Sequence, residues 1–192
     1  MLLCVSENLC WYTKAIYGFD HVVRLAPAGN WGRPSPCEGW TARHVVGHVL
    51  AIQRYVEASA RGVEPTLNPM VDPHTHCGDD PAGAWAATRD AVLAALDAPG
   101  ALDVMLITFR GEERMDDMIG LNIVDTTVHA WDLARALDVD TRLDPTLVDR
   151  CAELFLPLAD VVRAPTLYGD PVEVADGADA QTKFLALAGR RA

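Results

Sequence analysis

The stretch of residues 116–136 reads DDMIGLNIVDTTVHAWDLARA. We expect it to form one long helix. Within it, Asp125 and His129 are four residues apart, a spacing that places both side chains on one helix face with their Cβ atoms about 5–6 Å apart. A carboxylate and an imidazole placed in this way can chelate one metal ion, provided that a third ligand comes from another helix.

Helical patterns occupy much of the remaining chain. In the segment 41–60, apolar residues recur at helical spacing from Val45 to Val56, and Thr41 is a suitable N-cap. Pro157 is expected to bend or shorten the helix that contains it. Outside 116–136, the expected helices are 3–26, 41–60, 81–97, 145–162 and 180–188.

Two short stretches interrupt this pattern. The apolar run 102–109, with Gly111 close behind it, is typical of a strand in a small hairpin that closes near Met115. A second extended piece is expected at 166–174. Long helices joined by loops favour a bundle. The sequence therefore predicts one mostly all-α domain over residues 1–192, a four-helix bundle with short extended or hairpin decoration.

Composition and charge exclude several classes of protein. The chain has 192 residues, of which 50% are apolar, and a formal net charge of −11 without a basic stripe, so nucleic acid and anionic membranes are not expected partners. No apolar run approaches the roughly 20 residues that a membrane span needs. The five cysteines form no CxxC pair, which argues against a disulfide framework, and the N-terminus does not resemble a signal peptide. We therefore expect a cytoplasmic protein.

The third metal ligand must be sought among the other histidines. His48 lies three residues after Val45 and four before Ile52, so it shares the face that its helix should bury. A buried imidazole needs a partner, which either a metal ion or a plain hydrogen bond supplies. His44, four residues before His48, is an alternative on the same helix. The pattern alone leaves three interpretations open: a metal site, a hydrogen-bonded core histidine, and a polar stripe facing water at Asn122, Asp125, His129 and Asp132.

Other chemically active residues compete with this site. The proline-rich loop before residue 80 carries a cluster of His74, His76 and Cys77. We expect it to be surface decoration first, a substrate-facing lid second and a zinc site third. Cys37 precedes a helix, whose N-terminus can lower a thiol pKa, although a buried structural cysteine is the more common outcome. Trp40 and Trp131 are expected to fill core space.

Two segments resemble a known family. PSPCEGWTARHVVGH at 34–48 and DTTVHAWDLAR at 125–135 resemble motifs of the mycothiol-dependent maleylpyruvate isomerase N-terminal-domain family, part of the DinB-like superfamily. The ending FLALAGRR at 184–191 is similar to the tail of its short actinobacterial members. The similarity extends over nearly the whole chain, with both motifs in the right order and at the right separation.

The resemblance implies a DinB-like four-helix bundle with one divalent metal, usually zinc and sometimes nickel. Carried over by position, the ligands are His48, Asp125 and His129, which leaves an open coordination position. The resemblance places no ligand at His44. Asp125 stands where the isomerase itself has glutamate, so maleylpyruvate is not the expected substrate.

The leading functional expectation is a metal-dependent isomerase or S-transferase that uses mycothiol as cosubstrate and acts on a small electrophile. Asn122 and Asp132 would orient the ligands, and Arg43 would meet a substrate carboxylate. A homodimer is compatible with this expectation. Two alternatives remain: a metal-binding protein without thiol chemistry, serving stress response or structure, and a pathway-specific enzyme that has lost metal dependence.

Overall fold

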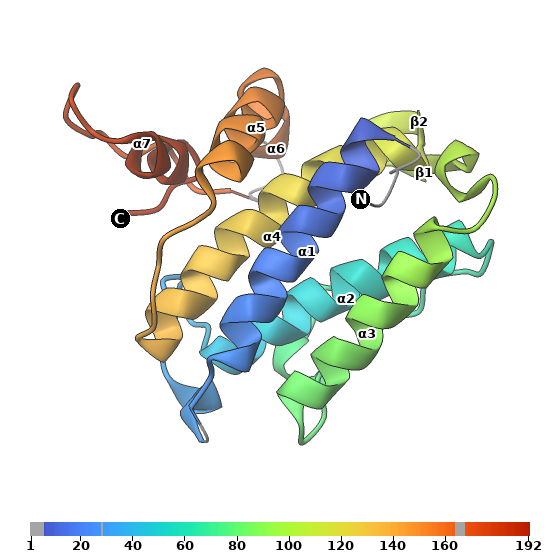
Figure 1. The fold of residues 1–192 in the computed structure, drawn as a ribbon, viewed down its shortest axis with the longest axis horizontal. Coiled ribbons are helices and arrows are strands. Elements are labelled where there is room, and N and C mark those ends of the chain that lie inside the picture. Colours follow the sequence, from blue (N-terminus) through green and yellow to red (C-terminus); the bar gives the residue numbers. More distant parts are fainter. Residues whose placement is uncertain (1–5, 28, 164–167) are drawn as a thin grey trace.

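Four long helices form the body of the structure, a computed structural model that describes residues 6–27, 29–163 and 168–192 (Figure 1). α1 packs along α4, and α2 packs against both α3 and α4. Contacts between α1 and α3 close the arrangement. The predicted helical bundle is therefore confirmed. Its helices are α1 (Glu7–Arg24), α2 (Ala42–Ala60), α3 (Pro81–Leu96) and α4 (Met115–Leu137).

Three shorter helices follow the bundle: α5 (Pro145–Phe155), α6 (Ala159–Arg163) and α7 (Ala180–Leu187). α5 packs against α4, and α7 packs against α5 (Figure 1). The helix expected over 145–162 is broken by a 3-10 turn at Leu156–Leu158. This break falls where Pro157 removes a backbone donor, as its sequence position indicated.

The two strands form a small antiparallel hairpin beside the start of α4. β1 (Met105–Thr108) pairs with β2 (Gly111–Arg114). The predicted strand over 102–109 began too early, because a 3-10 turn occupies Ala101–Asp103. Of the extended piece expected at 166–174, residues 166–167 lie outside the described residues. The part 168–174 has no regular structure, since its backbone bonds to the end of α7 rather than to a strand.

Short polar side chains start most of the helices, because each accepts a backbone N–H that the first helical turn leaves unpaired. α2 begins with a capping box, in which the Thr41 hydroxyl accepts from the backbone of His44 and the His44 ring accepts from the backbone of Thr41. Proline at the first position of α3 and α5 reinforces two of the starts. The other capping side chains are Ser6 for α1, Asp80 for α3, Asp144 for α5 and Asp179 for α7.

The core lies between the four long helices. Tyr12 and Phe19 of α1, Trp85 of α3 and Ile123 of α4 are among its fully buried side chains. Trp131 is buried as predicted, but Trp40 is only partly buried, so its assignment to the core is wrong. Trp40 precedes α2, and its ring lies 5.0 Å from the ring of His48.

The cysteines of the described residues are in two states. Cys37, Cys77 and Cys151 are free thiols, and Cys10 is disulfide-bonded. The sequence argued against a disulfide framework, so the bridge at Cys10 was not predicted. Over the described part of the chain, no helix combines the length and the hydropathy that crossing a membrane requires.

A buried polar chain ties α1, α2 and α4 together. The Tyr12 hydroxyl donates to Gln53 Oε1, and Gln53 Nε2 donates to Thr126 Oγ1 over 3.2 Å. All three side chains are inaccessible to solvent. We predict that Gln53→Leu lowers the free energy of unfolding by about 2 kcal/mol, because it leaves two buried hydroxyls without this partner. Urea unfolding measures the change; an unaltered midpoint would show that these bonds do not contribute.

Candidate metal centre

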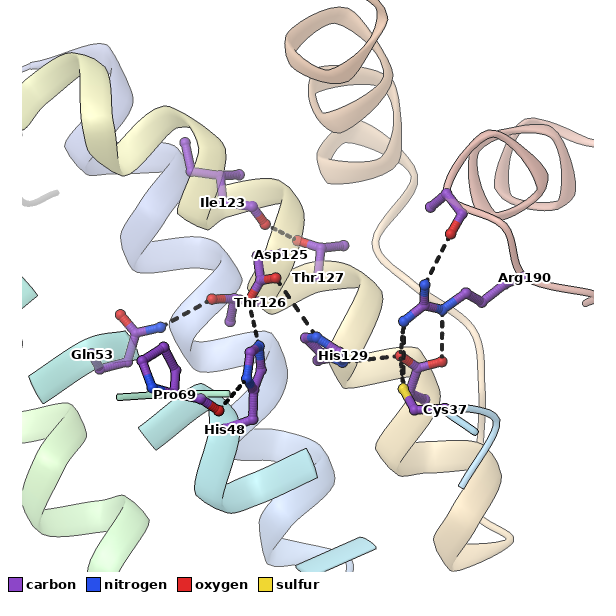
Figure 2. A network of polar contacts seen from close by, with 12 residues as sticks. Cys37, His48, Gln53, Pro69, Ile123, Asp125, Thr126, Thr127, His129 and Arg190 are labelled. Atoms are coloured by element: carbon purple, nitrogen blue, oxygen red, sulfur yellow. Dashed lines mark hydrogen bonds and ion pairs between the residues drawn. The ribbon is translucent and has the colours of Figure 1, made fainter. Parts of the chain in front are cut away.

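α2 and α4 bring the three predicted ligands together (Figure 2). His48 Nε2 lies 3.8 Å from Asp125 Oδ2, and His129 Nε2 lies 3.6 Å from Asp125 Oδ1. The three ligand atoms all lie within 4.8 Å of one another. Both imidazoles are more than nine-tenths buried. The Asp125–His129 pair of α4 therefore faces His48 on the buried side of α2.

The Nδ1 atom of each imidazole faces an oxygen atom of a neighbouring residue. His48 Nδ1 lies 2.9 Å from the carbonyl oxygen of Pro69 (Figure 2). Because a carbonyl only accepts, Nδ1 carries the proton and Nε2 presents its lone pair to Asp125. His129 Nδ1 lies 3.0 Å from Asp132 Oδ2, an ion-pair distance at which the two groups do not have hydrogen-bond geometry. Metal-binding histidines are typically oriented in this way by a carbonyl or carboxylate.

The Asp125 carboxylate is the feature that best fits a cation. Its Oδ2 atom is buried and has no hydrogen-bond partner among the described residues. Its distances to the two imidazoles, 3.6 and 3.8 Å, are too long for direct hydrogen bonds. A buried carboxylate oxygen without a partner is costly. Two imidazole nitrogens and one carboxylate are a donor set that suits zinc or nickel.

The electrostatics of these residues also favour a positive charge. Burial acts to raise the pKa of Asp125, but the nearby charges of His129 and His48 outweigh it and lower that pKa. Burial acts to lower the pKa of His48, but Asp125 and the Pro69 carbonyl leave it raised. The site therefore stabilises cationic character between its three side chains.

Arg190 and Cys37 contact Asp132, the carboxylate that lies beside His129. Arg190 donates to Asp132 from Nη2 over 2.8 Å and from Nε over 3.2 Å, and the Cys37 thiol donates to Asp132 Oδ2 over 3.3 Å. Cys37, His129 and Asp132 thus form a second group with metal-ligand distances. The Arg190 guanidinium already supplies the positive charge there, so this group orients His129 rather than holding a second ion.

A cavity of about 820 Å³ opens beside the triad. His48, Asp125 and His129 line it, together with the partly buried Trp40 and the arginines Arg190 and Arg191. The Tyr168 hydroxyl also lies in its wall and has no hydrogen-bond partner among the described residues. Burial raises the pKa of Tyr168, which keeps this hydroxyl a hydrogen-bond donor.

The structure places the other predicted residues differently. Asp132 contacts His129 as expected, whereas Asn122 lines the cavity and its amide donates to the sulfur of Met118. Arg43 does not reach the cavity wall, because its guanidinium donates to the carbonyls of His74 and Gly78. It therefore fastens a loop to α2.

His44, His74 and His76 lie outside the triad. His44 caps α2, and its ring lies 4.7 Å from that of His74. His76 Nε2 lies 3.2 Å from the Asn68 carbonyl, and Cys77 is buried under the same loop. Neither potential metal-ligand group found in the described residues includes the cluster of His74, His76 and Cys77.

Fold and site together define a helical bundle with a candidate metal centre between two of its helices. The family model described as "Mycothiol maleylpyruvate isomerase N-terminal domain" matches residues 13–134, more than half of the chain. The chain belongs to this family. The matched region contains the three candidate ligands and Asp132, and it excludes Arg190.

Individual relatives agree with this assignment. Rv0738 of Mycobacterium tuberculosis strain H37Rv and MT0763 of strain CDC 1551 are each 34% identical over 163 residues, covering 83% of this chain and 84% of the relative. The crystal structure of the mycothiol-dependent maleylpyruvate isomerase matches with a TM-score of 0.57 at 18% identity, and that of a mutant of the isomerase with 0.61 at 16%. Both alignments cover 83% of this chain and 70% of the other. At these identities the likeness shows a shared fold.

Proposed function

We propose that this chain is a metal-dependent enzyme that transfers a low-molecular-weight thiol, mycothiol, to a small electrophile, or isomerises the electrophile through such an addition. The observation that carries the proposal is the triad of His48, Asp125 and His129 at the wall of an open cavity. Membership of the mycothiol maleylpyruvate isomerase family supports the thiol. A cytoplasmic location, where such a thiol is available, is part of the proposal.

The free cysteines of the described residues are not activated, which favours a thiol from outside the chain. Burial and the nearby Asp132 carboxylate raise the pKa of Cys37 to about 12. Burial likewise raises the pKa of Cys151 to about 12 and that of Cys77 above its ordinary value. Since the thiolate is the nucleophile, these side chains are unreactive near neutral pH.

Each residue of the site has a separate role in the proposed reaction. A divalent ion held by the triad, zinc or nickel, would stabilise the thiolate form of the cosubstrate near neutral pH. Asp132 fixes the ring of His129, and the Pro69 carbonyl fixes that of His48. Arg191 supplies positive charge to the cavity wall, and Tyr168 offers a hydrogen bond to a substrate carbonyl.

The reaction is an addition. The cosubstrate sulfur forms a bond to an electron-poor alkene carbon, the π pair moves onto the conjugated carbonyl oxygen, and the neighbouring carbon then takes up the thiol proton. If the adduct rotates about the former double bond, gives up that proton again and expels the thiolate, which the proton rejoins, the result is isomerisation. If it keeps the thiol, the result is transfer.

Metal analysis tests the proposal. We predict about one zinc or nickel ion per chain, and a loss of affinity greater than about 100-fold in His48→Ala and His129→Ala, since even the groups that orient ligands change affinity by about 10–100-fold. His21→Ala, at an exposed histidine of α1, serves as control. Addition of mycothiol to methyl vinyl ketone by the loaded protein should disappear in the two ligand variants. Metal without turnover or thermal stabilisation by mycothiol would leave only a metal-binding protein.

A further inference from the structure

A second cavity, of about 360 Å³, continues from the metal cavity between α2, α4 and the hairpin. We call it the apolar arm. Both cavities share Ile52, Leu121 and Phe109 in their walls, so one molecule can occupy both. The apolar side chains that line the arm are Ile52, Tyr55, Ile107, Phe109, Met118 and Leu121.

The arm begins one helical turn from the metal ligands. Ile52 follows His48 by four residues on α2, and Leu121 precedes Asp125 by four residues on α4. Residues at this spacing share a helix face, with Cβ atoms about 5–6 Å apart. The faces that carry the ligands therefore continue directly into the arm.

The arm offers no free charge to a ligand. Of the described residues that line it, Arg110 and Glu113 are charged, and they pair with each other, with Arg110 Nε donating to Glu113 Oε1 over 3.2 Å. The free arginine side chain of Arg191 lies instead in the wall of the metal cavity. A small dicarboxylate would find no unpaired cationic side chain among the described residues of the arm.

Apolar side chains also remain exposed at its mouth. Ile107 is 85% exposed and Phe109 is 56% exposed, although both line the arm. Exposed apolar clusters of this kind commonly mark a ligand-binding groove. Together with the continuity of the two cavities, this exposure favours a ligand whose own surface is apolar.

We propose that the apolar arm holds the hydrocarbon body of the electrophile, an aliphatic chain or an aromatic ring, while its reactive carbon lies at the triad. This inference rests on the proposed function and adds the substrate class to it. Specificity would then lie in Ile52 and Leu121 on the helices and in Phe109 on the hairpin.

Binding of N-phenyl-1-naphthylamine, an uncharged apolar dye, tests the arm without any need for turnover. We expect Leu121→Glu to weaken dye binding by more than about tenfold, since it places a charge in an apolar wall. Phe109→Ser should weaken it by about fivefold, and as an exposed residue Phe109 can be changed without disturbing the core. Tyr17→Ser, at a 52% exposed aromatic residue of α1, is the matched control. Equal dye binding by wild type, Leu121→Glu and Phe109→Ser would overturn the proposal.

Turnover of alkyl vinyl ketones of increasing chain length separates this inference from the proposed function. With mycothiol and metal-loaded protein, kcat/KM should rise by about fourfold for each added methylene group, and Leu121→Glu should flatten that rise. Turnover that does not depend on chain length would refute the apolar arm and leave the proposed function standing. Dye binding that responds to the arm variants without turnover of any ketone would refute the proposed function and support the arm as an apolar ligand site.

Discussion

Asp132→Ala is expected to lower the free energy of unfolding by about 3–5 kcal/mol and to weaken metal binding by about 10–100-fold. Asp132 is fully buried and accepts two hydrogen bonds from Arg190. Its removal leaves a guanidinium in the protein interior without its carboxylate. It also takes away the group that lies 3.0 Å from His129 Nδ1. Chemical denaturation of the metal-free protein and metal titration with a competing chelator measure the two effects separately.

Arg190→Met separates stability from metal binding. This variant removes the same ion pair and should also lower stability, but it leaves the Asp132 carboxylate beside His129. Metal affinity should be unchanged or higher, because a nearby positive charge has gone. If Asp132→Ala binds metal as tightly as wild type does, Asp132 does not orient His129.

The contribution of Asp132 to the free energy of unfolding should decrease at low pH. Burial acts to raise the pKa of Asp132, but His129 and Arg190 outweigh it and lower that pKa to about 2. In the unfolded chain an aspartate has a pKa of about 3.9. Because the folded pKa is the lower one, the stabilisation is complete above about pH 4. The gap between wild type and Asp132→Ala in the metal-free protein should therefore stay constant down to that pH and narrow as pH falls towards 2.

Local spacing explains which parts of the site could be predicted. Asp125 and His129 lie on one helix, so four residues of separation are enough to place them together. The choice of His48 as the third ligand depended on the family resemblance as well. His44 lies on the same helix, and the sequence could not show that His44 caps α2. Tertiary contacts explain the rest. Arg190 reaches Asp132 from 58 residues away, and no local pattern predicts a partner at that distance.

In the fold, too, local patterns predicted some features, whereas tertiary contacts determine others. Helix-forming periodicity and N-cap residues predicted the described parts of the four long helices to within a few residues, and proline chemistry predicted the break at Pro157. Residues 3–5 of the first predicted helix lie outside the described residues. The sequence predicted an extended piece over 166–174, and its described part, 168–174, forms no strand. It lacks a strand because its position is set by contact with α7, which the local sequence does not encode.

Gly47→Ala is expected to disrupt the site although it adds only one methyl group. A Cβ atom at Gly47 would lie 1.8 Å from the carbonyl oxygen of Pro73 and 2.7 Å from its carbonyl carbon. Alanine normally favours a helix over glycine by about 1 kcal/mol, so propensity alone predicts stabilisation. The overlap with the Pro73 backbone should instead destabilise the protein, by about 1–3 kcal/mol. The Pro73 backbone then has to move away from α2.

The displacement should reach the metal centre through the same loop. Pro69 lies four residues before Pro73, and its carbonyl holds the Nδ1 atom of His48. We therefore expect Gly47→Ala to weaken metal binding by about 10–100-fold, as the loss of a group that orients a ligand does.

Gly18→Ala is the matched control for this prediction. Gly18 lies in α1, and a Cβ atom there would meet nothing within 4 Å. This variant should gain stability by up to about 1 kcal/mol and bind metal as wild type does. Thermal unfolding and metal titration of both variants decide the matter. If Gly47→Ala resembles Gly18→Ala in both measurements, the loop does not hold His48 in place, and the orientation of this ligand must come from the cavity side, where the Trp40 ring packs against it.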